Sequence, residues 1–265
     1  MTSAVRCILT DKQGFVWIGT KAGISRYDGH ELKKYVYSPN NPHSIPNNLI
    51  HQIAEDEMSN IWILTDKGIA RYQRQSDDFF LPTDEKGNPI IAYSTCLTKD
   101  GVLFGSKDKV YFYSYRDSSL RLLQKLNKGN NFNISLLSLW NEHTVLCCSR
   151  WQGLALLDLK TGKHRLPPFD CGKEIMNMLI DSQNRIWIAP YNEGIKCFTH
   201  NGELVKAYTT HNSDLSNNVV LSLAEREGKI WIGTDGGGIN ILEPETGRLS
   251  LLAVSYTHLT LPTIA

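Results

Sequence analysis

The chain has 265 residues, with 28 Lys and Arg against 27 Asp and Glu, and a formal net charge of +1. This length allows one large β domain or two smaller domains. The balanced charge gives no electrostatic reason to expect nucleic acid or an anionic membrane as a partner. No apolar run approaches the roughly 20 residues of a spanning helix, and the N-terminus lacks the features of a signal peptide. We therefore expect a segment that contacts neither nucleic acid nor a membrane.

The first copy of a repeated pattern predicts four short strands, which we place at Val5–Thr10, Val16–Thr20, Ile24–Tyr27 and Leu32–Tyr37. The turn "DKQG" between the first two strands combines an Asp that can bond the backbone with a Gly that tolerates positive φ, so it suits a tight hairpin. Asp56 and Asp181 occupy the same position in other copies. We predict that these aspartates cap hairpins and are not catalytic.

Six copies of this pattern follow one another along the chain. The second strands read "VWIGT", "IWILT", "VLFGS", "VLCCS", "IWIAP" and "IWIGT", and their second positions are Trp17, Trp62, Leu103, Leu146, Trp187 and Trp231. These positions are 45, 41, 43, 41 and 44 residues apart. A Gly followed by an aliphatic residue comes six or seven residues later in every copy except the third, which has Lys109.

Four short antiparallel strands per repeat of about 40–45 residues are typical of a β-propeller blade. One blade cannot bury both of its faces, so neighbouring blades must pack together, and a Trp ring can fill the space between them. We predict an all-β fold, a β-propeller of four-stranded antiparallel blades with six blades present. The predicted blades cover residues 3–45, 46–90, 91–132, 133–173, 174–217 and 218–254 of a propeller that spans 1–254.

The phrases "WIGTKAGISRY" and "SIPNNLI" resemble the two-component regulator propeller repeats of periplasmic sensors in hybrid two-component histidine kinases of Bacteroidetes. The similarity is closest at Asp11–Gly29, Ser44–Tyr72 and Ser216–Leu242, and it is weak across residues 95–160. The resemblance implies a propeller of seven blades, so we expect the six copies to be a truncated ring, with a closed six-bladed ring as the alternative. Residues 255–265 do not follow the repeat, and we interpret them as a non-native tail.

The resemblance also implies a setting for this segment. It places the segment in the periplasm, within a parent protein that is anchored in the inner membrane and signals by phosphorelay. Further propeller and β domains of the same parent chain are the implied partners, together with a second copy in a homodimer. The chain itself lacks the His box and the ATP lid of a kinase, so we expect no phosphotransfer and no other catalysis in it.

The turns between second and third strands are the candidate ligand site, because in propellers they share one face with the loops between blades. Two of these turns carry an aromatic ring, which can stack on a sugar while neighbouring polar groups bond its hydroxyls. The candidate ligand-binding residues are Arg150, Trp151, Tyr191, Asn192, Glu193 and Asp235. The alternative is that they are ordinary solvated loop residues.

The scattered residues that could bind metals form no recognisable site. The cysteines have neither CxxC spacing nor the pattern of a disulfide scaffold, and in strand-like runs they are expected to behave as small buried residues; they are Cys7, Cys96, Cys147, Cys148, Cys171 and Cys197. The eight histidines lack ligand spacing. We therefore predict no metal and no cofactor.

Three functions remain open from the sequence. The leading hypothesis is a sensor module that binds an oligosaccharide and passes a signal through the membrane. The second is a propeller enzyme of lyase or glycosidase type, which needs His, Tyr or carboxylate groups clustered at the channel mouth. The third is a structural scaffold that contributes dimer surface and binds no small molecule.

Overall fold

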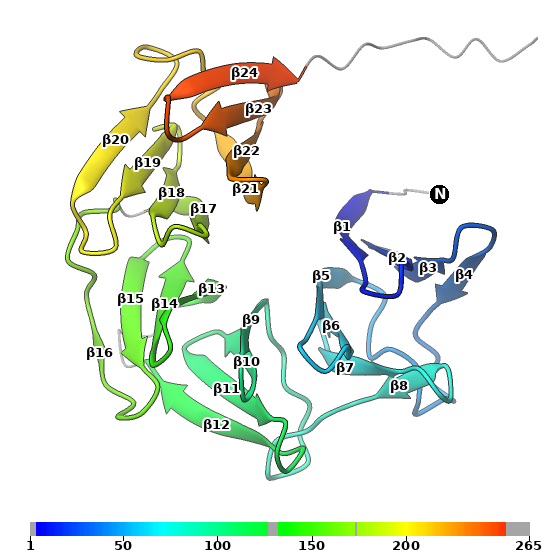
Figure 1. The fold of residues 1–265 in the computed structure, drawn as a ribbon. Coiled ribbons are helices and arrows are strands. Elements are labelled where there is room, and N and C mark those ends of the chain that lie inside the picture. The colour runs from blue at the N-terminus through cyan, green and yellow to red at the C-terminus, as the bar shows by residue number, and fades with distance from the viewer. Residues whose placement is uncertain (1–3, 127–131, 173, 253–265) are drawn as a thin grey trace, which may run out of the picture. The chain divides into compact units, whose positions relative to one another are not determined.

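A computed structural model describes residues 4–126, 132–172 and 174–252, so the predicted tail at 255–265 lies outside the described residues. In this part of the chain, 24 strands form six four-stranded antiparallel sheets in strict chain order (Figure 1). The fold is a β-propeller with six blades, as predicted. Among these residues we find no helix with the length and apolar character needed to cross a membrane.

The contacts divide the chain into two compact units, Met1–Pro167 and Pro168–Ala265, and each is described by itself. The first unit holds four blades. Their strands are β1 (Val5–Thr10), β2 (Val16–Thr20), β3 (Gly23–Tyr27), β4 (Leu32–Tyr35); β5 (Ile50–Glu55), β6 (Ile61–Thr65), β7 (Gly68–Gln73), β8 (Asp78–Phe80); β9 (Ser94–Thr98), β10 (Gly101–Ser106), β11 (Lys109–Ser114), β12 (Leu120–Lys125); and β13 (Ile134–Asn141), β14 (Thr144–Ser149), β15 (Gly153–Asp158), β16 (His164–Arg165).

The second unit holds two blades. Their strands are β17 (Ile175–Ile180), β18 (Ile186–Pro190), β19 (Ile195–Phe198), β20 (Leu204–Tyr208); and β21 (Val220–Arg226), β22 (Lys229–Thr234), β23 (Gly238–Glu243), β24 (Arg248–Leu252). The strands of each blade fall inside one of the predicted ranges. In the first blade the third strand starts one residue earlier than predicted and the fourth ends at Tyr35 instead of Tyr37.

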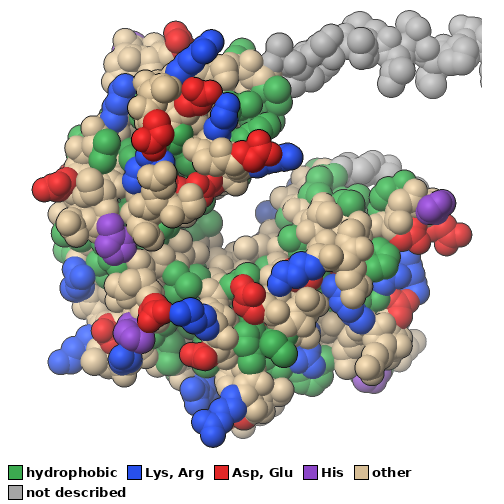
Figure 2. All heavy atoms as spheres, viewed as in Figure 1, with side chains coloured by type: hydrophobic (Ala, Val, Ile, Leu, Met, Phe, Trp, Pro, Cys, Tyr) green, Lys and Arg blue, Asp and Glu red, His purple; other side chains and the backbone are tan. Residues whose placement is uncertain are grey.

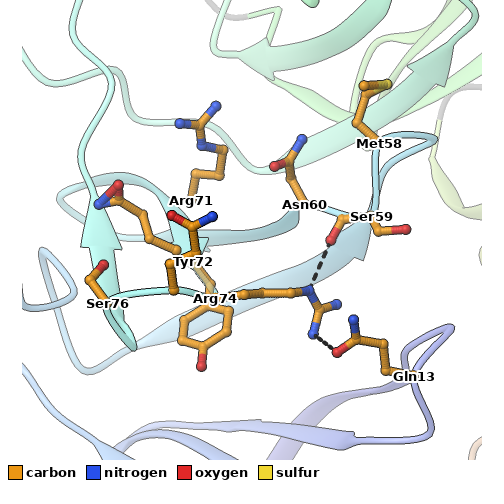
Figure 3. Close-up of a pocket in the computed structure, with 10 residues that line it drawn as sticks. Gln13, Met58, Ser59, Asn60, Arg71, Tyr72, Arg74 and Ser76 are labelled. Carbon is orange, nitrogen blue, oxygen red and sulfur yellow. Dashed lines mark hydrogen bonds between the residues drawn. The ribbon is translucent and has the colours of Figure 1, made fainter.

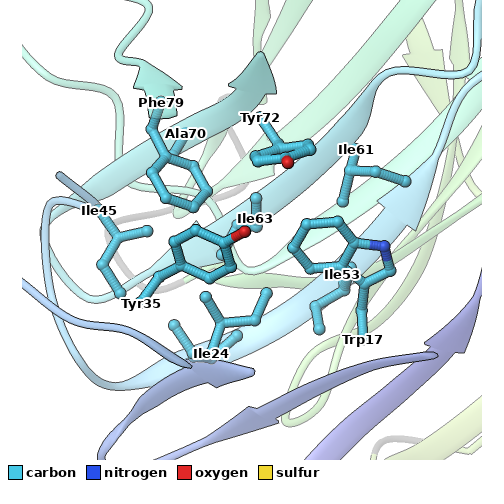
Figure 4. Packing of buried hydrophobic residues seen from close by; sticks show 11 residues of the cluster. Trp17, Ile24, Tyr35, Ile45, Ile53, Ile61, Ile63, Ala70, Tyr72 and Phe79 are labelled. Atoms are coloured by element: carbon cyan, nitrogen blue, oxygen red, sulfur yellow. The ribbon is translucent and has the colours of Figure 1, made fainter. Parts of the chain in front are cut away.

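Apolar side chains from two neighbouring sheets form each core. Between the first and second blades, Trp17, Ile24 and Tyr35 pack against residues of β6 and β7 (Figure 4). The Trp17 ring meets the Tyr72 ring edge-on, with centroids 4.8 Å apart, and stacks with Tyr35 at 6.2 Å. Burying a ring of this size removes roughly 150–250 Å² from water, so these rings supply much of the stabilisation between sheets.

The predicted role of tryptophan is confirmed in three blades and differs in the last. Trp17, Trp62 and Trp187 are buried. Trp231 is only partly buried, although it has the same place in β22. The three buried rings lie in cores that a neighbouring sheet completes.

The three aspartates cap the first hairpin of their blades, as predicted. Asp11 Oδ1 accepts hydrogen bonds from the backbone N–H groups of Gln13 and Phe15, both at 3.0 Å. Its other oxygen accepts a bond from Trp17 Nε1 at 3.0 Å. The same indole bond joins Asp56 to Trp62 at 2.7 Å and Asp181 to Trp187 at 2.8 Å. Each aspartate therefore both closes a turn and satisfies the buried indole N–H.

Gly23 begins β3 after a sharp reversal of the chain. Its φ is +114°, and a Cβ at this position would lie 2.5 Å from the Tyr35 carbonyl oxygen. Its N–H donates to the Asn48 carbonyl at 2.8 Å, and Thr20 Oγ1 donates to the Gly23 carbonyl at 2.9 Å. A side chain is excluded here by both backbone conformation and space.

The cysteines are buried thiols, as expected. Five of the six are buried and Cys7 is partly buried, and none forms a disulfide. Burial raises the pKa of Cys96 and of Cys197 to about 12 and that of Cys7 to about 11. These groups stay protonated near neutral pH, and a protonated thiol is a poor nucleophile and a poor metal ligand.

Candidate functional site

The antiparallel order of the strands gives each sheet two distinct ends. One end, which we call the connection end, carries the turn between the second and third strands, such as Lys21–Ala22, and the segments that join successive sheets. The opposite end, which we call the hairpin end, carries the first turn, such as Asp11–Gly14, and the turn between the third and fourth strands. All six predicted ligand-binding residues lie at connection ends.

In the second unit, the segment between β20 and β21 links two of the predicted turns. Gly194 N–H, at the end of the first turn, donates to the Asn218 carbonyl at 2.9 Å. Asp235, in the other turn, donates its N–H to the Val219 carbonyl at 2.9 Å and accepts a bond from Asn217 Nδ2 at 2.8 Å on its own carbonyl. The structure therefore brings the turn Tyr191–Glu193 and Asp235 to the same connecting segment.

The side chains of these two turns differ in their exposure and in their bonds to other residues. The Tyr191 side chain is exposed, with 49% of the residue surface accessible. Asn192 has a φ of +58°, which a short amide side chain tolerates. Glu193 is bonded by Lys196 Nζ at 2.7 Å. Tyr191, Asn192 and Asp235 are thus the members best placed to meet a ligand in this unit.

Arg150 and Trp151 lie in the first unit, in the turn between β14 and β15. Trp151 is 63% exposed, the highest value of any tryptophan in the described residues. The Arg150 guanidinium lies over its ring at 5.2 Å from the centroid. A cation–π contact of this kind is worth about 0.5–1 kcal/mol at an exposed site.

The first unit also contains a cluster that the sequence analysis missed. His51, on β5, approaches Asp66 Oδ1 with its Nε2 at 2.5 Å, and its ring meets the Tyr93 ring edge-on at 5.4 Å. Asp66 belongs to a turn between second and third strands, so the cluster lies at the connection end. His51 and Asp66 are 15 residues apart, so a search for ligand spacing could not pair them; the register of β5 against β6 could have.

The candidate residues place aromatic rings, amides and carboxylates at the connection ends. Exposed rings can stack on a sugar, and amide and carboxylate groups can bond hydroxyls. Among the described residues, no group of three His, Cys, Asp or Glu side chains is arranged to hold a metal ion. Acidic and basic side chains are interspersed on the visible surface (Figure 2), which accords with the net charge of +1.

The comparisons with known proteins support the resemblance predicted from the repeats. The family model described as two component regulator propeller matches residues 1–22 and 214–236. These segments include β1 and β2 of the first blade and β21 and β22 of the last. No curated protein matches the sequence significantly.

Several solved structures share the fold. The extracellular domain of BT4673 from B. thetaiotaomicron, assigned as a one component system, has a TM-score of 0.76 and 18% identity, over 95% of this chain and 37% of that chain. The extracellular domain of BT3049 from the same organism, assigned as a hybrid two component system, has a TM-score of 0.76 and 18% identity, over 96% and 35% of the chains. PorZ of Porphyromonas gingivalis, a surface component of the type-IX secretion system, has a TM-score of 0.66 and 16% identity, over 93% and 45%.

This chain therefore spans less than half the length of each of these structures. At such low identities the similarity shows only that these proteins share the propeller fold. The fold carries many functions, so any activity must be argued from the site itself.

Proposed function

We propose that this chain is the extracytoplasmic sensor segment of a hybrid two-component histidine kinase. In this proposal it lies in the periplasm, in a parent protein with further propeller and β domains, and it performs no catalysis. It contributes to signalling by binding an oligosaccharide at its connection ends, and the parent converts that binding into phosphorelay. The two segments that match the regulator propeller family support this choice over other propeller classes.

One observation carries the ligand assignment. Trp151 and Tyr191 expose 63% and 49% of their surfaces in turns where other blades place charged or small residues, such as Lys21–Ala22. An exposed aromatic ring with polar groups beside it offers a sugar both a stacking face and hydrogen bonds. Arg150, Asn192, Glu193 and Asp235 are the polar groups that we assign to hydroxyl recognition.

Calorimetric titration of neutral oligosaccharides tests this proposal. We expect the intact chain to bind at least one of them and the double variant Trp151→Ala, Tyr191→Ala to bind it at least tenfold more weakly. Tyr27→Ala is the matched control, because Tyr27 is 39% exposed at the hairpin end. Undiminished binding by the double variant would contradict the assignment, and no binding by the intact chain would favour a scaffold.

The cluster of His51, Asp66 and Tyr93 favours an enzyme as the second candidate. A histidine held by a carboxylate beside a tyrosine can transfer protons, which is what a lyase or glycosidase of propeller type requires. Product analysis alongside the titrations would detect such activity. Product formation that His51→Ala abolishes would replace the sensor proposal with this one.

A further inference from the structure

Two arginines occupy equivalent positions in the first and second blades. Arg26 lies opposite Trp17 in the pairing of β2 with β3, and Arg71 lies opposite Trp62 in the pairing of β6 with β7. Each guanidinium lies over the indole ring of its own blade, at 5.8 Å and 6.0 Å from the centroid. The two arginines therefore have the same strand register and the same stacking on an indole ring.

Arg26 has a carboxylate partner. Its NH1 bonds the hydroxyl of Tyr72 in the next blade and lies 3.3 Å from Asp77 Oδ1. Asp77 also accepts bonds from Tyr35 at 2.6 Å and from Tyr72 at 2.5 Å, and it forms an ion pair with Lys33. The positive charge at this position is therefore neutralised within the protein.

Arg71 bonds the equivalent tyrosine of the next blade, but among the described residues it has no carboxylate partner. Its NH1 bonds the hydroxyl of Tyr113 at 2.6 Å, and Tyr113 occupies the place of Tyr72 in the third blade. The residue that corresponds to Asp77 is Ser118, and its φ of 53° is close to the 56° of Asp77. Within the described residues Arg71 forms no salt bridge. The backbone that presents a carboxylate to Arg26 is thus repeated beside Arg71 with a hydroxyl in its place.

The surroundings of Arg71 are also more open than those of Arg26. Phe15, whose ring lies 4.9 Å from the Arg26 guanidinium, is replaced in the second blade by the smaller Asn60. A pocket of about 360 Å³ opens at this hairpin end, and its lining includes Asn60, Arg71, Arg74, Gln75 and Ser76 (Figure 3).

The second arginine of this pocket, Arg74, is bonded to other groups of the protein. Arg74 bonds the Ser59 carbonyl at 3.3 Å and Gln13 Oε1 at 2.8 Å, as the dashed lines in Figure 3 show. It also bonds Asp11 Oδ2 at 3.1 Å. Of the two arginines that line this pocket, Arg71 is therefore the one whose charge is not paired with a carboxylate among the described residues.

We propose that Arg71 forms a subsite for the carboxylate of an acidic saccharide, in which the ligand carboxylate takes the place that Asp77 has beside Arg26. Arginine binds carboxylates through parallel hydrogen bonds. The amides and hydroxyls of Asn60, Gln75 and Ser76 provide bonds for sugar hydroxyls. Phe80, which is 41% exposed and whose ring lies 5.1 Å from the Arg71 guanidinium, offers a surface for the sugar ring.

Two acidic residues limit the direction of approach. Asp84 and Glu85 line a second pocket, of about 330 Å³, together with Phe80 and Ser118. Asp84 caps its own turn by accepting bonds from Lys86 N–H at 2.9 Å and Asn88 N–H at 2.8 Å. Their negative charge disfavours an anion that approaches through this second pocket, so the ligand carboxylate reaches the Arg71 guanidinium through the pocket that Asn60 lines.

Titration with tri-galacturonate tests the proposal, which rests on the proposed function for its saccharide class. We expect the intact chain to bind it, more weakly at high salt, and Arg71→Gln to weaken binding by about tenfold or more. Ser118→Asp should weaken it as much, because the new carboxylate would occupy the subsite from within. The control Ser118→Asn adds similar bulk without charge and should bind within about twofold of the intact chain.

Several outcomes would overturn the proposal. The first is absence of tri-galacturonate binding, and the second is binding by Arg71→Gln or Ser118→Asp that is as tight as binding by the intact chain. The others are equally tight binding of the neutral trisaccharide at this subsite, or tighter binding of a glutamate-rich peptide. The Trp151→Ala, Tyr191→Ala variant separates this site from the connection ends. If that variant alone loses tri-galacturonate, the proposed function stands and the Arg71 subsite fails; if only the hairpin-end variants lose it, the reverse holds.

Discussion

The contact between the first and second blades and the contact between the fifth and sixth blades share an aspartate and a tryptophan but differ in the arginine that pairs with the aspartate. In both, a carboxylate closes a hairpin and accepts the indole N–H of a buried tryptophan. In both, a glutamate of the following blade accepts the backbone N–H next to that aspartate, Glu55 from Lys12 at 2.8 Å and Glu225 from Ser182 at 2.7 Å. These ties are common to both units of the chain.

The two contacts differ in which blade supplies the arginine that bonds the aspartate. Asp11 receives its guanidinium from Arg74, which belongs to the next blade. Asp181 receives its guanidinium from Arg185 in the same hairpin, at 2.7 Å, and Arg185 then reaches Glu245 of the next blade at 2.9 Å. The carboxylate position is therefore the constant feature, and a cation can reach it from either blade.

The largest difference between the two contacts should appear on removing the tryptophan. Trp17→Ala and Trp187→Ala each create a large cavity and should lower the free energy of unfolding by about 3–5 kcal/mol. Trp17→Ala should cost more, because Trp17 contacts both Tyr35 and Tyr72, whereas among the described residues Trp187 has one aromatic ring beside it, Tyr208 at 6.3 Å. Urea denaturation followed by circular dichroism measures this, with Tyr27→Ala as an exposed control expected within about 0.5 kcal/mol of the intact chain. Equal losses for both variants would show that the extra rings add little.

The sequence alone predicted this part of the fold because it is repeated. The tryptophan, the glycine after it and the hairpin aspartate recur in phase, so one copy supports the interpretation of the others. The strands of the first blade were predicted to within two residues. The partial exposure of Trp231 was not predicted, because the letters around it match the other copies and the difference lies in what packs against the sheet.

The candidate site was harder to predict, since it depends on contacts between residues far apart in the chain. The indole bond to Asp11 spans six residues and is visible in the repeat. The bond between Arg26 and Tyr72 joins residues 46 apart, and the pair of His51 and Asp66 crosses two strands. Such contacts follow from strand register and from the packing of one sheet on the next, which the residue types alone do not specify.

A double-mutant cycle should sharpen the difference in charge placement. The pair Asp11 and Arg74 joins two blades, with side chains 0% and 24% exposed, so its coupling energy should be about 1–3 kcal/mol. Asp181 and Arg185 lie within one hairpin, so their coupling energy should report local turn stability. The bond from Arg185 to Glu245 of the next blade is lost in both Arg185 variants and cancels from the cycle. We would measure the four variants of each cycle in urea. A coupling below about 0.5 kcal/mol for Asp11 with Arg74 would show that Trp17 and the turn amides satisfy the carboxylate without it.

Asp77 should make the stability of the first contact depend on pH. Burial opposes its ionisation, but hydrogen bonds from Lys33, Tyr35 and Tyr72 outweigh this and lower its pKa to about 2. A carboxylate with a lowered pKa in the folded state stabilises that state above the ordinary value near 4, and the contribution disappears as the pH falls towards 2. We expect Asp77→Asn to lower stability by about 1–2 kcal/mol at pH 6 and by about half of that at pH 3. A constant difference across this range would contradict the assignment.

The smallest effect should come from transferring this carboxylate to the other contact. The counterpart of Asp77 in the sixth blade is Gly247, with a φ of +71°, and a Cβ there would lie 2.9 Å from Lys206 Nζ and 3.6 Å from the Tyr208 hydroxyl. Lys206 and Tyr208 correspond to Lys33 and Tyr35, so Gly247→Asp should meet the same two partners. The gain is offset by the left-handed backbone, which costs about 1 kcal/mol for a residue with a side chain.

We therefore expect Gly247→Asp to change stability by less than about 0.5 kcal/mol at pH 6 and to destabilise the chain at pH 3, where the added carboxyl group begins to lose its charge. Gly247→Asn is the matched control, because it has the same shape and backbone cost without the charge. Urea denaturation at the two pH values compares them. If the two variants have equal stability at pH 6, Lys206 and Tyr208 do not bind the carboxylate, and the Asp77 arrangement depends on Arg26, which Cys197 replaces in the fifth blade.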